Sequence, residues 1–288
     1  MSESTEKPKI YFISFADSRM AAATTRIAKQ AAEMNFFDEI HVMNEADLGE
    51  EFRERWKDVM RPGVRGFGYW CWKPYIIRRK LEQLEEGDIL LYCDAGCHLN
   101  PGGVERLKNY CESLKNDSLG IKAFNAFSGI IDVRERRWTK GDVFEYFSCR
   151  EQKNITESKQ VAATQIILRK CETSIDFFND WLRTIENDFS LIDDSVSKSQ
   201  NLRGFIEHRH DQSIFSVLYK LRGGVTFSEE ETEVSIGKDM SSYPIWDVRD
   251  RGYKDKRFFS RLRRWVKAKI LMSKIRIEKL RCRFCGEE

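Results

Sequence analysis

The sequence predicts an α/β fold in which a mixed, mostly parallel β-sheet is flanked by helices. The first observation is a β-α-β order at the start: residues 9–15 are β-branched and aromatic, residues 19–34 place alanines and Ile27 on one helical face, and residues 38–42 form a second strand. The second is the short apolar run at residues 89–93, ILLYC, which is typical of a strand buried on both faces. Strands joined through helices in this way run parallel in one sheet.

Helical and strand patterns continue to alternate after this opening. A charged helix is expected at residues 50–60, followed by a loop at 61–70 that contains Gly and Pro. Pro74 lies near the start of a helix at 74–85, where helices tolerate proline, and Gly87 separates that helix from the next strand. The remaining expected elements are helices at 104–114, 175–187 and 210–221, strands at 121–127, 161–168 and 225–227, and a polar loop at 188–204.

The composition is that of a globular protein without a membrane span. Of 288 residues, 41% are hydrophobic and 33% charged, and no apolar run approaches the ~18 residues that a spanning helix needs. The polar start MSESTEKPK has no apolar signal region, so a cytoplasmic protein is expected. Its eight cysteines follow no framework spacing and are expected to be reduced thiols; the lone Cys282–Cys285 pair has no second ligand pair nearby, which disfavours a zinc site.

Positive charge is concentrated at the end of the chain. Residues 254–288 carry 13 Lys/Arg against 4 Asp/Glu, a net of +9, which leaves −6 on residues 1–253. We therefore expect one α/β domain over residues 1–253 and a basic tail over 254–288. Within 254–283 the apolar residues have near-helical spacing, which predicts a basic amphipathic helix on an anionic membrane surface, each basic residue contributing about 1 kcal/mol. Packing on the domain and nucleic-acid contact are the alternatives, and nucleic acid is the least favoured.

Asp94 is the first candidate for chemistry. It directly follows the apolar strand, and ligands of open α/β sheets bind in the crevice beyond the carboxyl ends of the strands. Ala95 and Gly96 follow, and Gly96 would let a bulky group approach the backbone. Mn²⁺ and Mg²⁺ need only one or two protein carboxylates in addition to substrate phosphates and water. The sequence therefore predicts a metal–phosphate site here, with a turn or helix cap as the alternative.

The second candidate is the cluster EHRHDQ at residues 207–212, at the start of an apolar helix. Imidazole and carboxylate groups within one helical turn are a common source of acid–base or ligand chemistry. Asp211 is the expected catalytic or sugar-orienting carboxylate, and His208 or His210 a polar or metal contact. The alternative is an exposed helix start in which an acid suits the helix dipole.

The third candidate is residues 65–74, RGFGYWCWKP, where aromatic residues alternate with glycines and end at a lysine. Arg65, Tyr69 and Trp70 would line a pocket that stacks a flat base. Lys73 would neutralise a phosphate near a helix N-terminus. A buried aromatic loop explains the pattern equally well.

The stretches RGFGYWCWKPYIIRRKLEQLEEGDILLYCDAGCHLN and IEHRHDQSIFSVLYK resemble a family of bacterial glycosyltransferases of capsule and lipopolysaccharide synthesis. The likeness runs from Lys9 to about Lys254 and implies a GT-A-like (Rossmann-like) catalytic domain. It also implies that a hexose is transferred from a nucleotide-diphosphate sugar to a growing bacterial surface glycan, on a glycan or lipid-linked acceptor. The enzyme would lie peripherally at the inner face of the cell membrane.

The resemblance also implies roles for individual residues. Asp94 matches the first acid of an Asp-x-Asp motif whose second acid is absent here, so Asp94 alone or with His210 would hold Mn²⁺ or Mg²⁺. Asp211 matches the acid near the reacting carbon and Asp17 the place where the nucleotide lies. The residues expected to contact the nucleotide sugar are Phe15, Ala16, Asp17, Arg65, Tyr69, Trp70, Lys73, Ala95, Gly96, Ala163, Thr164, His208 and Gln212.

Two other functions remain open from the sequence. A nucleotidyltransferase would also use a metal and a nucleotide crevice, but it usually has a Gly-rich basic loop after the first strand, and FADSRM contains no glycine. A catalytically inactive, membrane-associated adaptor fits the missing second acid and the basic tail.

Overall fold

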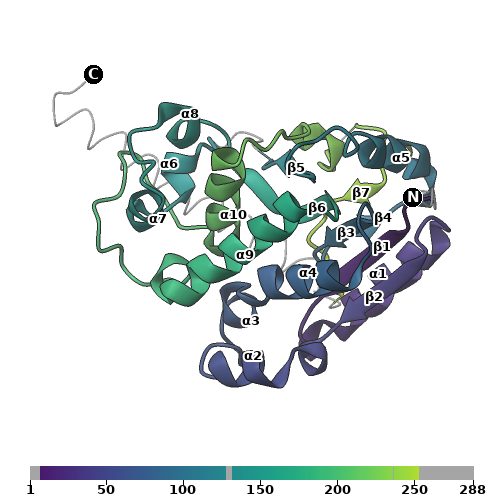
Figure 1. Cartoon of the computed structure of the whole chain (residues 1–288), viewed down its shortest axis with the longest axis horizontal. Helices are drawn as coiled ribbons and strands as arrows, with labels where there is room; N and C mark the ends of the chain where they lie inside the picture. The colour runs from purple at the N-terminus through teal and green to yellow at the C-terminus, as the bar shows by residue number, and fades with distance from the viewer. Residues whose placement is uncertain (1–6, 128–131, 236, 253–288) are drawn as a thin grey trace, which may run out of the picture.

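The computed structural model describes residues 7–127, 132–235 and 237–252. Its centre is a five-stranded sheet in the order β2-β1-β3-β6-β5 (Figure 1). The strands are β1 (Ile10–Phe15), β2 (Glu39–Met43), β3 (Ile89–Cys93), β5 (Ile121–Asn125) and β6 (Val161–Arg169). β1 pairs parallel with β2 and β3, whereas β6 pairs antiparallel with both β3 and β5. Only β6 is reversed among these five strands, so the sheet is mixed and mostly parallel, as expected.

Helices cover both faces of the sheet. α1 (Ala21–Glu33) and α5 (Val104–Glu112) pack on one face, in a cluster that includes Phe12, Leu91 and Cys93. α4 (Trp72–Gln83), α9 (Glu172–Asn187) and α10 (His210–Leu221) pack on the other. The shorter helices are α2 (Glu50–Arg55), α3 (Gly66–Tyr69), α6 (Glu135–Trp138), α7 (Gly141–Tyr146) and α8 (Lys153–Thr156). In Figure 1, α6, α7 and α8 gather beside α10.

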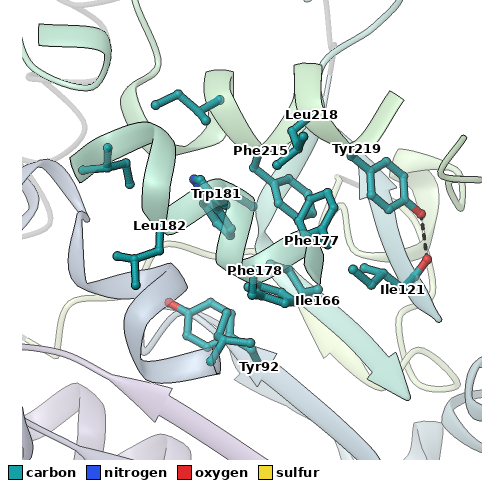
Figure 2. Close-up of a cluster of buried hydrophobic side chains, with 14 of the residues drawn as sticks. Tyr92, Ile121, Ile166, Phe177, Phe178, Trp181, Leu182, Phe215, Leu218 and Tyr219 are labelled. Atoms are coloured by element: carbon teal, nitrogen blue, oxygen red, sulfur yellow. Dashed lines mark hydrogen bonds between the residues drawn. The ribbon is translucent and has the colours of Figure 1, made fainter. Parts of the chain in front are cut away.

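Aromatic side chains of α9 and α10 form a core that holds α10 against the sheet. Phe177 and Trp181 of α9 lie 5.5 and 5.0 Å, centroid to centroid, from the ring of Phe215 of α10 (Figure 2). The hydroxyl of Tyr219 donates a hydrogen bond of 3.0 Å to the carbonyl of Ile121 in β5. Truncating one such buried aromatic residue costs about 3–5 kcal/mol. This packing therefore holds α10 rigidly against the sheet.

Some expected elements differ from those observed. The helix expected at residues 50–60 ends at Arg55, and residues 225–227 form no strand beyond one bridge between Phe227 and Phe124. α6, α7 and α8 were not expected, because helices of four to six residues depend on tertiary packing rather than on a repeating pattern. A small antiparallel pair, β4 (His98–Leu99) with β7 (Ile245–Trp246), was also not expected.

The described residues also bear on the cysteines and on membrane crossing. Cys71, Cys93, Cys97, Cys111, Cys149 and Cys171 are buried and free. Within the described ranges, no helix has both the length and the apolar composition that crossing a bilayer requires. The expected amphipathic helix at 254–283, and with it the expected tail domain, lies outside these ranges.

Candidate functional site

Asp94 lies at the carboxyl edge of the sheet, one residue beyond β3. Its backbone N–H donates to the carbonyl of Thr164 at 2.8 Å, which continues the β3–β6 pairing. The hydroxyl of the fully buried Tyr92 donates to Asp94 Oδ1 at 2.5 Å. The Asp94 carboxylate is therefore held by a buried hydroxyl, and its side chain, which is 27% exposed, still reaches solvent.

Lys73 joins Asp94 to Asp211. Its Nζ lies 2.6 Å from Asp211 Oδ2 and 3.2 Å from Asp94 Oδ1, and it donates to the carbonyl of Ala163 at 3.0 Å. Two of the three ammonium hydrogens are thus donated to Asp211 and Ala163, and Asp94 forms an ion pair with the same group. The side chains of Lys73 and Asp211 are only 3% and 7% exposed. The Lys73 charge is thus shared by two carboxylates of the protein, and its expected contact with a substrate phosphate stays a prediction.

Burial shifts the ionisation of this cluster. Desolvation by burial, with the added repulsion of Asp94, outweighs the attraction of Lys73 and raises the pKa of Asp211 to about 6. Burial disfavours the charge on Lys73, but the Asp211 and Asp94 carboxylates outweigh it and raise the pKa of Lys73. Near pH 7 Lys73 is therefore an ammonium beside an ionised Asp211, and Asp211 takes up a proton on mild acidification.

A segment that the sequence did not identify forms a third side of the site. β7 places Asp247 near Asp94: burial, with the charge of Asp94, raises the pKa of Asp247 despite Arg249. Asp247 Oδ1 is buried without a hydrogen-bond partner in the part of the chain described, and lies 3.7 Å from Nε of Arg249. No local pattern marked these residues. Only the β4–β7 pairing brings them to Asp94.

Asp250 fastens this segment to the sheet edge. Asp250 Oδ2 lies 2.9 Å from Nε2 of His98 and 2.9 Å from Nη1 of Arg26. Its backbone N–H donates to the carbonyl of Gly96 at 2.9 Å. A Cβ built on Gly96 would lie 3.4 Å from the Cα of Arg249. The backbone at Arg249 therefore lies in ordinary van der Waals contact with this position, and the expected ligand contact of Gly96 stays a prediction.

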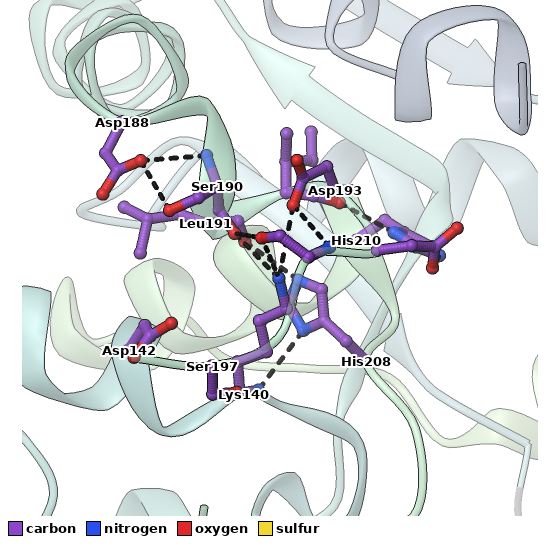
Figure 3. A network of polar contacts seen from close by, with 12 residues as sticks. Lys140, Asp142, Asp188, Ser190, Leu191, Asp193, Ser197, His208 and His210 are labelled. Atoms are coloured by element: carbon purple, nitrogen blue, oxygen red, sulfur yellow. Dashed lines mark hydrogen bonds and ion pairs between the residues drawn. The ribbon is translucent and has the colours of Figure 1, made fainter. Parts of the chain in front are cut away.

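His208 faces the interior. Its Nε2 lies 2.9 Å from the carbonyl of Leu191, and its Nδ1 accepts the backbone N–H of Lys140 at 3.3 Å (Figure 3). The first contact requires a proton on Nε2 and the second a lone pair on Nδ1, so the ring is neutral. Burial lowers its pKa well below the usual value. His208 thus ties the start of α10 to the 188–204 segment through Leu191, and its expected nucleotide-sugar contact stays a prediction.

His210 also faces the 188–204 segment. Its Nδ1 donates to the carbonyl of Ile192 at 2.7 Å, and Nε2 lies 3.6 Å from Asp194 Oδ1. Its ring lies 5.3 Å from Tyr69 and 5.7 Å from Trp70. Within the described ranges, no group of three or more His, Cys, Asp or Glu side chains is arranged to hold a metal. His210 therefore packs in tilted contact with two aromatic rings, and its expected role as a metal ligand stays a prediction.

Arg65 and the aromatic loop pack on this same segment. Arg65 pairs with Glu207 at 2.9 Å and Asp194 at 3.5 Å. Trp70 has a left-handed backbone and its ring covers Gly66, where a Cβ would come within 2.4 Å of it. The structure thus brings Arg65, Tyr69, Trp70 and His210 together beside residues 188–204, and their expected contact with a flat base stays a prediction.

The other expected contacts lie at the carboxyl edge of the sheet or below it. Phe15 is buried with its ring 4.2 Å from that of Trp72, and Ala16 is buried beside it. Asp17 follows β1, which neighbours β3, and is paired with Arg19 at 2.6 Å. Three further expected residues make hydrogen bonds within the protein. The carbonyl of Ala95 accepts from Arg26, the carbonyl of Thr164 accepts from the Asp94 N–H, and the Gln212 amide donates to Gln160.

A surface hollow of about 340 Å³ lies away from this cluster, beside β5 and β6. Two lysines line it, and both are neutralised: Lys159 pairs with Glu229 at 2.5 Å and Lys220 with Glu135 at 2.7 Å. Its chemistry is therefore that of neutral polar groups, and it shares no residue with the Lys73 cluster.

The fold and site define an α/β protein with two carboxylates at the carboxyl edge of a mostly parallel sheet. No family model and no curated protein matches the sequence. Solved structures similar to this one include a glycosyltransferase involved in glycosylation of the major capsid of PBCV-1, at 10% identity and TM-score 0.45, covering 84% of this chain and 94% of the other.

Two further structures resemble this chain. Galactosyltransferase LgtC, in complex with donor and acceptor sugar analogs, is 16% identical with TM-score 0.40, and covers 77% of this chain and 74% of the other. Mouse xyloside xylosyltransferase 1 is 7% identical with TM-score 0.40, and covers 77% and 84%. At TM-scores below 0.5 these likenesses carry no conclusion about the activity of this chain.

Proposed function

We propose that this protein is a glycosyltransferase that moves a sugar from a nucleotide-diphosphate sugar to an acceptor hydroxyl. The observation that carries the proposal is the pair of carboxylates, Asp94 and Asp211, held by one buried lysine at the carboxyl edge of the sheet. Ligands of open α/β sheets bind at this edge. Both motifs that resemble the glycosyltransferase family thus supply one carboxylate to a single cluster.

The proposed reaction changes the charge on the leaving diphosphate oxygen, on C1 of the sugar and on the acceptor hydroxyl. The C1–oxygen bond to the diphosphate breaks and its electron pair stays on the leaving oxygen, while the acceptor oxygen bonds to C1 and loses its proton. A carboxylate near C1 stabilises the positive character of the ring or accepts that proton. Asp211 suits the second role, because a base with a pKa of about 6 is ionised at neutral pH and still basic enough to take a proton.

The acidic residues fit a divalent cation bound jointly with substrate. Asp94 and Asp247 are two nearby carboxylates, and the buried Oδ1 of Asp247, although 3.7 Å from Arg249 Nε, has no hydrogen-bond partner among the described residues, so a cation or its water could supply one. Mn²⁺ or Mg²⁺ needs no more protein ligands than these when phosphate oxygens and water complete its shell. Bound there, the ion would neutralise charge on the diphosphate. His210 is not needed in this arrangement.

Lys73 acts through the carboxylates in this proposal. Its ammonium brings Asp94 and Asp211 together and favours the ionised form of Asp211, although their like charges repel each other and Asp211 is buried. We therefore assign Lys73 as a positioning residue.

The finer function follows the family resemblance of the two motifs. We infer that the donor sugar is a hexose and that the acceptor is a growing bacterial surface glycan, of capsule or lipopolysaccharide type, carried on a lipid. Residues 254–283 would then hold the enzyme at the inner face of the membrane through anionic lipids.

The test is to incubate the full chain with a panel of nucleotide sugars and Mn²⁺ and to follow release of the nucleoside diphosphate. We expect one or a few donors to be consumed, more rapidly when acceptor glycan is added. Release of pyrophosphate from a nucleoside triphosphate and a sugar phosphate would instead identify a nucleotidyltransferase. If no donor binds in a metal-dependent way, the protein would instead be the catalytically inactive adaptor.

A further inference from the structure

Among the residues that the structure describes, the guanidinium of Arg209 pairs with no carboxylate. Arg209 precedes α10, two residues before Asp211, and its Cζ lies 4.0 Å from the ring centroid of Trp138. Among the described residues, this ring face is the contact of its guanidinium, which makes no hydrogen bond or ion pair. The nearest acids are engaged elsewhere: Glu207 pairs with Arg65 and Glu135 with Lys220.

The surroundings make this charge costly. Burial, followed by the charge of Arg249, lowers the pKa of Arg209 to about 10, so it remains a cation at neutral pH. A partly buried charge that is repelled by another arginine is unfavourable unless an anion compensates it. The folded protein supplies none among the residues described, which points to an anion from outside the chain.

Trp138 and the backbone hold Arg209 in place. The Arg209 N–H donates to the carbonyl of Trp138 at 3.0 Å, and the Trp138 indole N–H donates to the carbonyl of Asp132 at 2.6 Å. Trp138 is only 3% exposed. The indole is therefore a rigid platform, and it leaves the edge of the guanidinium, where its N–H groups lie, free to bind an anion.

Arg249 supplies a second cation from the opposite part of the chain. Its backbone is left-handed, with φ of 53°, and the next residue is fastened to Gly96, His98 and Arg26 through Asp250. Its side chain is 77% exposed and lies beside Asp247 at 3.7 Å. The fixed backbone thus holds a solvent-accessible guanidinium beside Gly96, two residues after Asp94, while Arg209 lies two residues before Asp211, and Lys73 joins those two carboxylates.

We propose that Arg209 and Arg249 form an anion subsite that binds the diphosphate of the donor, with Trp138 as the platform under Arg209. Guanidinium groups bind phosphate oxygens through paired N–H donors, so two of them match a diphosphate. The subsite adjoins the Asp94–Asp247 carboxylates through the Asp247–Arg249 contact, which places anion-binding and cation-binding groups next to each other. This assignment rests on the proposed function.

The test measures binding of inorganic pyrophosphate to the full chain by calorimetry, with and without Mn²⁺. Salt of about 0.15 M, where charges are screened beyond about 8 Å, limits diffuse binding to the basic tail. The variants are Arg209→Gln and Arg249→Gln, and the control is Arg183→Gln, which removes one charge from a 64% exposed side chain on α9. We expect Arg209→Gln to weaken pyrophosphate binding about 10- to 100-fold, because the substitution removes charge-assisted hydrogen bonds to the phosphate oxygens. Arg249→Gln is expected to weaken it about 3- to 10-fold because this side chain is exposed, and the control less than about twofold.

Thermal unfolding separates binding from a structural role. Arg209→Gln removes an uncompensated charge, so its melting temperature without ligand should equal or exceed that of the wild type. A lower melting temperature together with unchanged pyrophosphate affinity would make Arg209 a structural cation and overturn the subsite. So would a wild-type protein that binds no pyrophosphate.

The subsite and the proposed function fail in different ways. Pyrophosphate binding that depends on Arg209, in a protein that consumes no nucleotide sugar, would keep the subsite and reject the transferase. Sugar transfer by Arg209→Gln with wild-type rate and donor KM would keep the transferase and reject the subsite.

Discussion

The ammonium of Lys73 lies 2.6 Å from Asp211 Oδ2, and the two residues are 138 positions apart in the sequence. Because both side chains are buried, the ion pair joins the N-terminal ends of α4 and α10 directly beneath Asp94. A buried pair of this kind is costly to break from one side, because the remaining charge has no water to solvate it. The predictions below follow from this arrangement.

Lys73→Met should destabilise the fold. The substitution keeps most of the side-chain volume but leaves Asp211 and Asp94 facing each other without a cation, which costs about 3–5 kcal/mol in free energy of unfolding. Urea denaturation followed by fluorescence measures this. The matched control is Lys115→Met, whose side chain is 64% exposed in an i,i+3 pair, with an expected change within about 0.5 kcal/mol. Equal stability of the two variants would show that Lys73 does not fasten the cluster.

Turnover should fall in mild acid. Asp211, with a pKa of about 6, must be ionised to accept a proton, so kcat should decrease about tenfold per pH unit below pH 6. A profile of kcat from pH 5 to 8 at saturating donor measures this. A flat profile over that range would remove Asp211 as the base.

The same shift affects stability with a definite sign. The pKa of Asp211 is higher in the folded state than its ordinary value of 3.8, so the native state binds the proton more tightly. This contribution to stability is complete below pH 3.8 and is lost as pH rises through 6. The unfolding free energy of wild type minus that of Asp211→Asn should therefore decrease from pH 4 to pH 7. An increase over that window would contradict the assignment.

Asp94→Asn should abolish most of the turnover. The amide keeps the shape of the carboxylate but loses its charge, and the loss of one electrostatic contact in an active site costs about 10²- to 10³-fold in kcat. Calorimetry should also show weaker donor binding with Mn²⁺ and little change without it. Asp176→Asn, on an exposed position of α9, is the control and should match the wild type in both assays. Wild-type turnover in Asp94→Asn would exclude Asp94 from the mechanism.

Asp250→Ala should release the segment that carries Asp247 and Arg249. Asp250 contacts His98, Arg26 and the carbonyl of Gly96, and its side chain provides the first two contacts. Hydrogen–deuterium exchange of residues 247–252 should accelerate at least tenfold, and pyrophosphate affinity should fall about 3- to 10-fold. Asp239→Ala, an exposed turn residue that accepts from the Ser241 N–H, should leave both unchanged. Unchanged exchange in Asp250→Ala would show that other contacts hold the segment.

Local patterns in the sequence predicted the sheet and the position of Asp94. The apolar run at 89–93 and the β-branched run at 9–15 form β3 and β1 as expected, because alternation and burial are encoded within a few neighbouring residues. The same reasoning placed Asp94 beyond the strand and Asp211 at the start of a helix. The sequence also identified Lys73 as a candidate, with a substrate phosphate as its expected contact. Its ion pair with Asp211 could not be predicted, because the two residues are far apart in the sequence.

The partners of buried charges were decided by the tertiary structure alone. Lys73 pairs with Asp211, and Asp247 comes near Asp94, only after strands and helices distant in the sequence have packed together. His208 and His210 turn inward because the carbonyls of Leu191 and Ile192 need hydrogen-bond donors once water is excluded from them. The sequence by itself determined which segments are buried and where their polar ends emerge. Tertiary packing then determined the partner of each buried charged group. A charged side chain that is removed from water needs a hydrogen bond or an ion pair, and only the folded chain determines which groups lie close enough to provide it.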